Sequence, residues 1–255
     1  KLGKLFPVHI KFIVQFVDHG CHIGPGLYTV FLYLLCLHGW NTGLSTTEGL
    51  FVQGRKLHAG NSAIHENARR VLLNREIQAV VLENGAKQIL SEGLTYERCE
   101  VGIITNIDWH QDLSEYKIQT PQERSDVYRT QMDVVLPSGM AILLADDPQL
   151  VALAQYCDGQ VTLFSRSAST PALTEHIAAG HRGVFMDHGQ LVLADGVNRH
   201  NLCAMAEIAC TEQARNHQQI CNVLAAAAAA WALGVSTELI EAGLLGFDAN
   251  TALPS

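Results

Sequence analysis

Short apolar segments alternate with helix-like segments along most of this chain. Strands are expected at residues 12–17, 42–46, 79–83, 101–107, 140–144 and 161–164. Helices are expected near residues 27–38, 63–73, 121–134 and 148–157. Because parallel strands are joined by crossover connections that are usually helical, this alternation predicts an α/β fold, with a mostly parallel sheet and flanking helices.

The last third of the chain adds two features to this pattern. Residues 183–186 and 191–193 flank the polar triplet Asp187-His188-Gly189, which predicts an antiparallel β-hairpin added at the edge of the sheet. Residues 213–233 are expected to form an alanine-rich helix, with alanine at every position from 225 to 230, and a last helix is expected over residues 237–245. Because alanine carries only a methyl group, the alanine-rich helix is expected to pack closely on the sheet.

Length and composition limit the class of protein. The chain has 255 residues, 48% of them hydrophobic and 16% charged, which suits one large globular domain over residues 1–255. A net charge of −8 argues against nucleic acid or a membrane as a partner, since phosphate groups require clustered Lys and Arg. Seven scattered cysteines without a CxxC pair indicate reduced thiols, and the sequence has neither a signal segment nor a long apolar run. We therefore expect a cytoplasmic protein.

The segment over residues 12–38 has the layout of a phosphate-binding loop: an apolar strand, a glycine-bearing loop and an apolar helix. Such a loop needs a lysine for the β- and γ-phosphates and a Ser or Thr hydroxyl for magnesium. No lysine or arginine lies between Lys11 and Arg55. The site is therefore either lost or rebuilt. Gly20 and Gly24 belong either to an unusual anion-binding nest at the helix N-terminus or to a vestigial turn that only joins strand to helix.

Five segments occur in an order and at a spacing typical of one family, namely residues 43–54, 92–94, 99–106, 145–148 and 222–226. With a match that runs from residue 5 to about residue 247, they resemble the central, ATP-binding domain of the Mur ligase family, and more closely that domain of cyanophycin synthetases. The resemblance implies a P-loop-like domain. In such ligases ATP phosphorylates a carboxylate, and an amine then attacks the acyl phosphate.

Compared residue by residue with this family, the phosphate chemistry is missing at several positions. Residues 20–25 align with the GTNGKT loop, so that Gly24 stands in place of the lysine and Pro25 in place of the hydroxyl. Ala86 replaces an arginine of the family. Arg129 aligns with the lysine that many relatives carbamylate to bridge magnesium, and a guanidinium cannot form a carbamate. The resemblance thus implies a catalytically degenerate domain.

Other positions of the family are retained. Glu83 matches the glutamate that holds magnesium, and Asn106 and His110 match an Asn…His element after the next strand. Asn222 lies where active relatives contact the nucleotide base. The resemblance therefore implies a vestigial metal site at Glu83 and His110 and a vestigial nucleotide pocket at Gly20, Gly24 and Asn222. The alternative is that these side chains only make structural hydrogen bonds at the end of an inherited sheet.

Two neighbouring features also allow two interpretations. Asp108, His110 and Asp112 alternate as the ligands of a metal triad would, although a solvated loop has the same spacing. Cys221, beside Asn222, is expected to be a core thiol, because no neighbouring base is visible in the sequence that would lower its pKa.

The resemblance leads to three functional hypotheses. In the first, this is a degenerate domain with a structural and oligomerisation role in a cyanophycin synthetase. That parent would join β-aspartyl-arginine dipeptides through its own ATP-grasp domain. The parent would use ATP and magnesium and hold the cyanophycin polymer, whereas this domain would bind no cofactor and would contact the ATP-grasp domain and other copies of the chain.

In the second hypothesis, the domain is an active amide ligase that adds arginine to an aspartate side chain through a rebuilt phosphate site. It would take its lysine from Lys87 or Lys117. The third hypothesis is a stand-alone module that binds a small anion or a nucleotide. The chain is expected to be a C-terminal piece of a longer polypeptide and to lack the lid lobe with which relatives continue.

Overall fold

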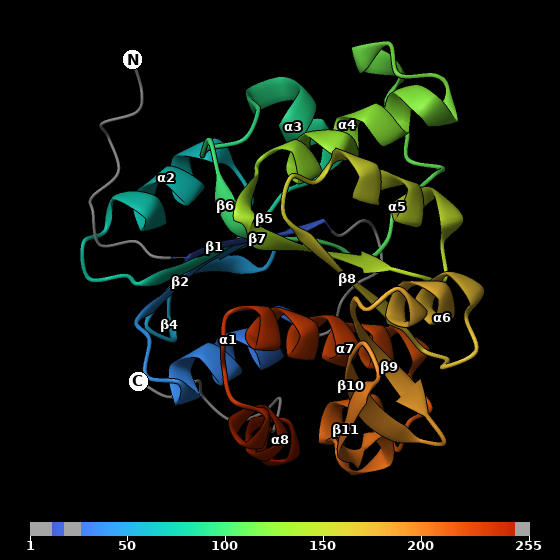
Figure 1. The fold of residues 1–255 in the computed structure, drawn as a ribbon. Coiled ribbons are helices and arrows are strands. Elements are labelled where there is room, and N and C mark those ends of the chain that lie inside the picture. Colours follow the sequence, from blue (N-terminus) through green and yellow to red (C-terminus); the bar gives the residue numbers. More distant parts are fainter. Residues whose placement is uncertain (1–11, 18–26, 248–255) are drawn as a thin grey trace.

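The computed structural model describes residues 12–17 and 27–247, and in this part of the chain the strands form one eleven-stranded sheet (Figure 1). Its central strands are all parallel. In spatial order they are β2 (Thr42–Thr46), β5 (Ala79–Glu83), β1 (Phe12–Val17), β6 (Cys99–Ile104), β7 (Val135–Leu144), β8 (Gln160–Ser165) and β9 (Arg182–Asp187). The predicted α/β fold with a mostly parallel sheet is confirmed.

Antiparallel strands extend the sheet at both of its sides. Next to β2 lie β3 (Gly49–Val52) and β4 (Arg55–Ala59), which the sequence patterns did not predict. Next to β9 lie β10 (Gln190–Asp195) and β11 (Asn198–Ala204). The predicted hairpin is the β9–β10 pair, in which His188 and Gly189 have φ angles of 46° and 79°, as a tight hairpin turn requires. It lies at that side of the sheet as predicted, and β11 adds one further strand that was not predicted.

Helices cover both faces of the sheet (Figure 1). One face carries α1 (Leu27–Leu37), α7 (His217–Ala232) and α8 (Thr237–Gly246). The other face carries α2 (His65–Leu73), α3 (Ala86–Glu92), α4 (Pro121–Asp133), α5 (Pro148–Ala152) and α6 (Pro171–Ala178). Among the helices that the structure describes, none has the length and apolar character to span a membrane.

The period-2 alternation of strand side chains divides the core between these two helical layers. In β5, Ala79 and Val81 pack with the layer of α1 and α7, whereas Val80 and Leu82 pack with α2 on the opposite face. All four side chains are buried. Strands that are apolar on both faces require cover on both sides, which is why the segments between strands form helices.

Helix α7 packs directly on the sheet. It contacts β6, β7, β8 and β9, and it also packs against α1 and α8. Every alanine from Ala225 to Ala230 is at most 1% exposed. The prediction of close helix-to-sheet packing is confirmed.

The predicted start of this helix at residue 213 was wrong. Glu212, Gln213 and Ala214 have φ angles of 54°, 60° and 60°, in the left-handed region, so the right-handed helix cannot include them. It starts instead after Asn216, whose side chain accepts a hydrogen bond from the backbone N–H of Gln219 at 3.2 Å.

Enlarging one alanine of α7 tests this packing. Ala226→Leu inserts three carbon atoms into a fully buried position, and it is expected to lower the free energy of unfolding by about 2 kcal/mol and Tm by roughly 6 °C. Ala232→Leu, at the half-buried last position of the same helix, is the matched control and is expected to leave Tm nearly unchanged. Thermal unfolding measures both. Equal losses in the two variants would contradict the packing constraint.

Candidate functional site

The parallel strands place one set of polar side chains at a common edge of the sheet, where β2, β5, β6, β7 and β8 end. We name this the carboxyl edge; open α/β sheets bind ligands there. The residues that follow or end these strands include Thr47, Glu83, Asn106, Asp146 and Arg166. Their surroundings decide which ligand chemistry the carboxyl edge can support.

Glu83, the last residue of β5, is 6% exposed, and its carboxylate is held by Thr47. The Thr47 backbone N–H donates to Oε2 at 2.7 Å, and the Thr47 hydroxyl donates to Oε1 and Oε2 at 3.1 and 3.0 Å. The pKa of Glu83 is higher than that of an ordinary glutamate, mainly because the carboxyl group is buried. The hydrogen bonds from Thr47 lower the pKa in part, and the nearby charge of Glu48 raises it. Both carboxylate oxygens therefore have partners within the chain.

The loop after β6 contains the Asp-His-Asp series. Asp108 accepts a hydrogen bond from the backbone N–H of His110 at 2.9 Å, and Asp112 accepts one from the backbone N–H of Ser114 at 3.0 Å. The side chain of His110 is exposed. Within the described residues, no group of three or more His, Cys, Asp or Glu side chains is placed to hold a metal ion. The Asp-His-Asp metal triad was thus a wrong interpretation, and the series is a solvated turn. The pair of Glu83 and His110 as vestigial ligands stays a prediction.

Helix α4 presents a tyrosine, and not Arg129, to this loop. Tyr128 is fully buried near Arg124 and Asp108, and the Arg124 guanidinium donates to the Asp108 carbonyl at 3.3 Å. The guanidinium of Arg129 lies instead 4.1 Å from the ring centre of Tyr156. The assignment of Arg129 to the lysine position of the family stays a prediction.

Asn222, the predicted base-contacting residue, is fully buried in α7. Its Oδ1 accepts a hydrogen bond from Gln218 Nε2 at 3.3 Å, and its Nδ2 donates to Gln219 Oε1 at 3.4 Å. These contacts are all within the first turns of the helix. They agree with the alternative in which Asn222 bridges polar groups at the start of α7.

Next to Asn222, the structure brings together groups from three elements. Arg166 follows β8, and its Nη1 lies 2.9 Å from Nδ1 of His217, the first residue of α7. Burial raises the pKa of the Cys221 thiol to about 11. The positive charge of Arg166 lowers this pKa in part, and the negative charge of Asp146 raises it. Cys221 is half-buried and packs against the core, and its raised pKa agrees with the expectation that no neighbouring base activates it. The Arg166–His217 pair was not predicted, because its partners lie 51 residues apart and neither belongs to a recognisable motif.

The remaining site predictions concern the glycine loop and the replacement lysines. Gly20 and Gly24 lie outside the described residues. Lys87 is exposed and its Nζ pairs with Glu115 at 3.3 Å. Lys117 follows a short 3₁₀ turn and has a φ angle of 62°. The exposed ion pair of Lys87 offers no support for a rebuilt phosphate site.

Comparisons with known proteins give a consistent relationship. No family model matches the chain. It is similar to cyanophycin synthetase from a Nostoc species, with 28% identity over 210 residues that cover 82% of this chain and 23% of that protein. Cyanophycin synthetase from a Synechocystis species is 27% identical over the same share of this chain and 24% of its own length. The chain thus spans about a quarter of the length of these curated relatives.

Solved structures share the fold. The UDP-N-acetylmuramoyl-L-alanyl-D-glutamate–2,6-diaminopimelate ligase structure superimposes with a TM-score of 0.67 at 11% identity, over 96% of this chain and 48% of that one. MurF from Acinetobacter baumannii gives a TM-score of 0.60 at 18% identity, over 94% and 46%. Escherichia coli FolC, in complex with DHPP and ADP, gives 0.61 at 16% identity, over 96% and 58%. These neighbours define the architecture of the domain.

The environment of Glu83 gives a prediction for stability. Because its pKa is raised in the folded state, the folded chain binds more protons than the unfolded chain as the pH rises above the ordinary glutamate pKa, and Glu83 costs stability in that range. Glu83→Gln keeps the acceptor for Thr47 and removes the charge. Its stability relative to the parent chain is expected to be greater at pH 7.5 than at pH 4, as measured by urea unfolding.

Thr47→Val provides the complementary change, because it removes the hydroxyl donor and keeps the backbone donor. We expect it to lower the free energy of unfolding at pH 7.5 by about 2 kcal/mol, the usual value for a hydrogen bond to a charged group. A pH-independent difference for Glu83→Gln, together with an unchanged stability for Thr47→Val, would show that the carboxylate is not held as described.

Proposed function

Because the chain is homologous to a segment of cyanophycin synthetase over 82% of its length, we propose that it is the Mur-ligase-like domain of such a protein, without its own phosphate chemistry. Its role in the parent protein would be structural. It would support a separate ATP-grasp domain that uses ATP and magnesium to join β-aspartyl-arginine dipeptides. Other copies of the chain would be its assembly partners, and the parent would hold the polymer.

One observation carries this proposal: no lysine or arginine lies between Lys11 and Arg55, where a ligase of this architecture places the lysine of its phosphate loop. Phosphoryl transfer builds negative charge on the phosphate oxygens, and preorganised cationic donors stabilise it. Losing one such donor costs about 3 kcal/mol of transition-state stabilisation. Ala86, in place of the family's arginine, removes a second cation from the same chemistry.

The described side chains add support, since the groups that active ligases direct at ligands are engaged within this chain. Glu83 is bound by Thr47 at both oxygens, and Asn222 is bonded to two glutamines of its own helix. Helix α7 still packs closely on the sheet. This combination suits a domain selected for its shape and contact surfaces.

A second function has its own supporting observation. The Arg166–His217 pair lies at the carboxyl edge beside Asn222, where an arginine and an imidazole could hold an anionic or nucleotide ligand. A module of this kind would bind nucleotide without needing magnesium. An active ligase, by contrast, would bind ATP only with magnesium, because the metal bridges the phosphate oxygens.

Nucleotide binding by the 255-residue chain separates these functions. Calorimetric titration with ATP is expected to show no tight binding and no hydrolysis, with or without magnesium. Micromolar affinity that depends on magnesium would contradict the proposal and favour an active site. If the chain binds ATP without magnesium and the Arg166→Gln variant does not, the result would favour the binding module.

The structural role is tested in the parent protein. Deleting this domain is expected to abolish oligomerisation, solubility or polymer synthesis. Glu83→Gln and His110→Ala are expected to leave polymer synthesis nearly unchanged, because neither side chain would contact a reacting phosphate. A fall of about a hundredfold in either variant, roughly 2.7 kcal/mol, with an intact oligomer would mean that the carboxyl edge still takes part in the chemistry.

A further inference from the structure

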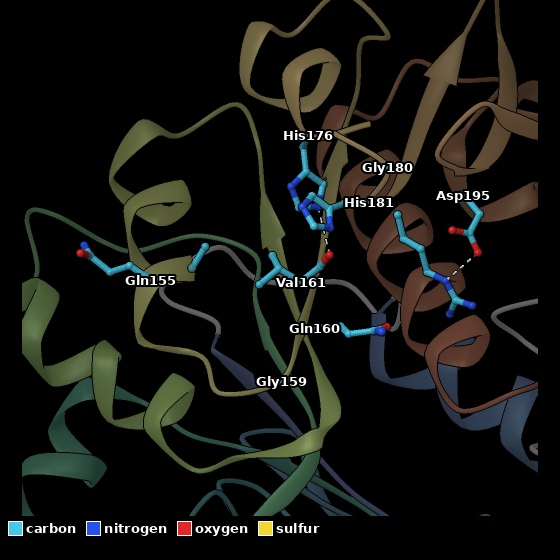
Figure 2. Close-up of a pocket in the computed structure, with 10 residues that line it drawn as sticks. Gln155, Gly159, Gln160, Val161, His176, Gly180, His181 and Asp195 are labelled. Carbon is cyan, nitrogen blue, oxygen red and sulfur yellow. Dashed lines mark hydrogen bonds and ion pairs between the residues drawn. The ribbon is translucent and has the colours of Figure 1, made fainter. Parts of the chain in front are cut away.

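A cavity of about 640 Å³ with a mixed polar and apolar lining lies at the opposite edge of the sheet from the carboxyl edge (Figure 2). It is formed where β8 and β9 begin, and we name it the amino-edge cavity. Its polar lining comes from Gln155, Gln160, His176, His181, Arg182 and Asp195. The volume lies within the range of small-molecule sites, and none of these residues belongs to the ligase-type site discussed above.

A cation and an anion stand side by side in this cavity. Arg182 and Asp195 are opposite each other in the β9–β10 pair, and Arg182 Nε donates to Asp195 Oδ2 at 3.2 Å. Both side chains stay accessible, at 32% and 51% exposure. The guanidinium lies 4.4 Å from the ring centre of Trp231, which restricts its orientation. Within the described residues, its two terminal nitrogens make no side-chain hydrogen bond, so they remain available to a ligand.

The histidines form a second wall of the cavity. The rings of His176 and His181 lie against each other (Figure 2), and they are stacked with centroids 4.7 Å apart. His176 Nε2 lies 3.0 Å from the carbonyl oxygen of Val161, which fixes this ring against β8. Burial lowers the pKa of His176, so the inner ring stays neutral to a lower pH than usual. Exposed His181 and the Gln160 amide add groups that can donate or accept hydrogen bonds.

The charges of the cavity select a dipolar ligand. An anion alone would be attracted by Arg182 but repelled by Asp195. A cation alone would be attracted by Asp195 but repelled by Arg182. A ligand that carries both charges can engage each without leaving the other unpaired. A carboxylate also matches the planar guanidinium fork.

We propose that the amino-edge cavity binds a zwitterionic small molecule, an α-amino acid or a short peptide, through Arg182 at its carboxylate and Asp195 at its ammonium group. The site does not depend on the proposed function. The simpler alternative is that Arg182 and Asp195 form only a cross-strand ion pair, which would contribute about 0.2–1 kcal/mol to stability.

A matched set of probes tests the proposal on the 255-residue chain. L-glutamine carries both charges, N-acetyl-L-glutamine only the negative one, and L-glutaminamide only the positive one. Calorimetry is expected to show saturable binding of L-glutamine, with about tenfold weaker binding of each derivative. Asp195→Asn and Arg182→Gln are each expected to weaken L-glutamine binding by about tenfold, a free-energy loss of roughly 1.4 kcal/mol.

The control is Glu66→Gln, which removes an exposed ion pair with Arg70 on α2, away from the cavity, and is expected to leave binding unchanged. If either charge variant fails to fold, His181→Ala and Gln160→Ala replace it, because both side chains are exposed and line the cavity; each is expected to weaken binding. The proposal is overturned if L-glutamine shows no saturation at concentrations on the order of 10 mM, or if the charge and lining variants bind it normally. Equally tight binding of N-acetyl-L-glutamine would also overturn it, by indicating a simple anion site.

Discussion

The close approach of α7 to the sheet is the constraint on which the rest of this structure depends. Six consecutive buried alanines surround more than one full turn of the helix, and α7 contacts strands β6 to β9 as well as α1 and α8. Helices α1 and α8 contact α7 in the same layer, and α1 also contacts β2 and β5 of the sheet. The start of α7 also fixes His217 and Asn222 relative to the strand ends. The geometry of the carboxyl edge therefore follows from a packing contact of small side chains.

Polar groups at the carboxyl edge form contacts between strands that are distant in the sequence. Thr47 and Glu83 lie 36 residues apart, and their hydrogen bonds tie the end of β2 to the end of β5. Arg124 ties α4 to the loop after β6 in the same way, through the Asp108 carbonyl. Such contacts within the chain hold the strand ends together.

The layered α/β architecture could be predicted because apolar strands and helical segments differ in period and length. The hairpin β3–β4 could not, since its turn at Gln53-Gly54 uses positive φ angles of 48° and 72° with a weak sequence signal. The left-handed conformation of Glu212, Gln213 and Ala214 before α7 could not be predicted either, because it also has a weak sequence signal. Within the site, Glu83 and Asn222 were found through a family resemblance. The partners of these two residues and the Arg166–His217 pair depend on tertiary contacts that no local pattern encodes.

The antiparallel strands at the two sides of the sheet have a consequence for self-association. Within the described chain, β4 and β11 are the outermost strands, and all five residues of β4 are exposed, including Arg55 and Lys56. The first four residues of β11 are exposed as well, with Arg199 and His200 among them. Hydrated cations on an outer strand hinder the docking of another strand, because pairing would remove their water. Strand-by-strand association of this domain through β4 or β11 is therefore disfavoured.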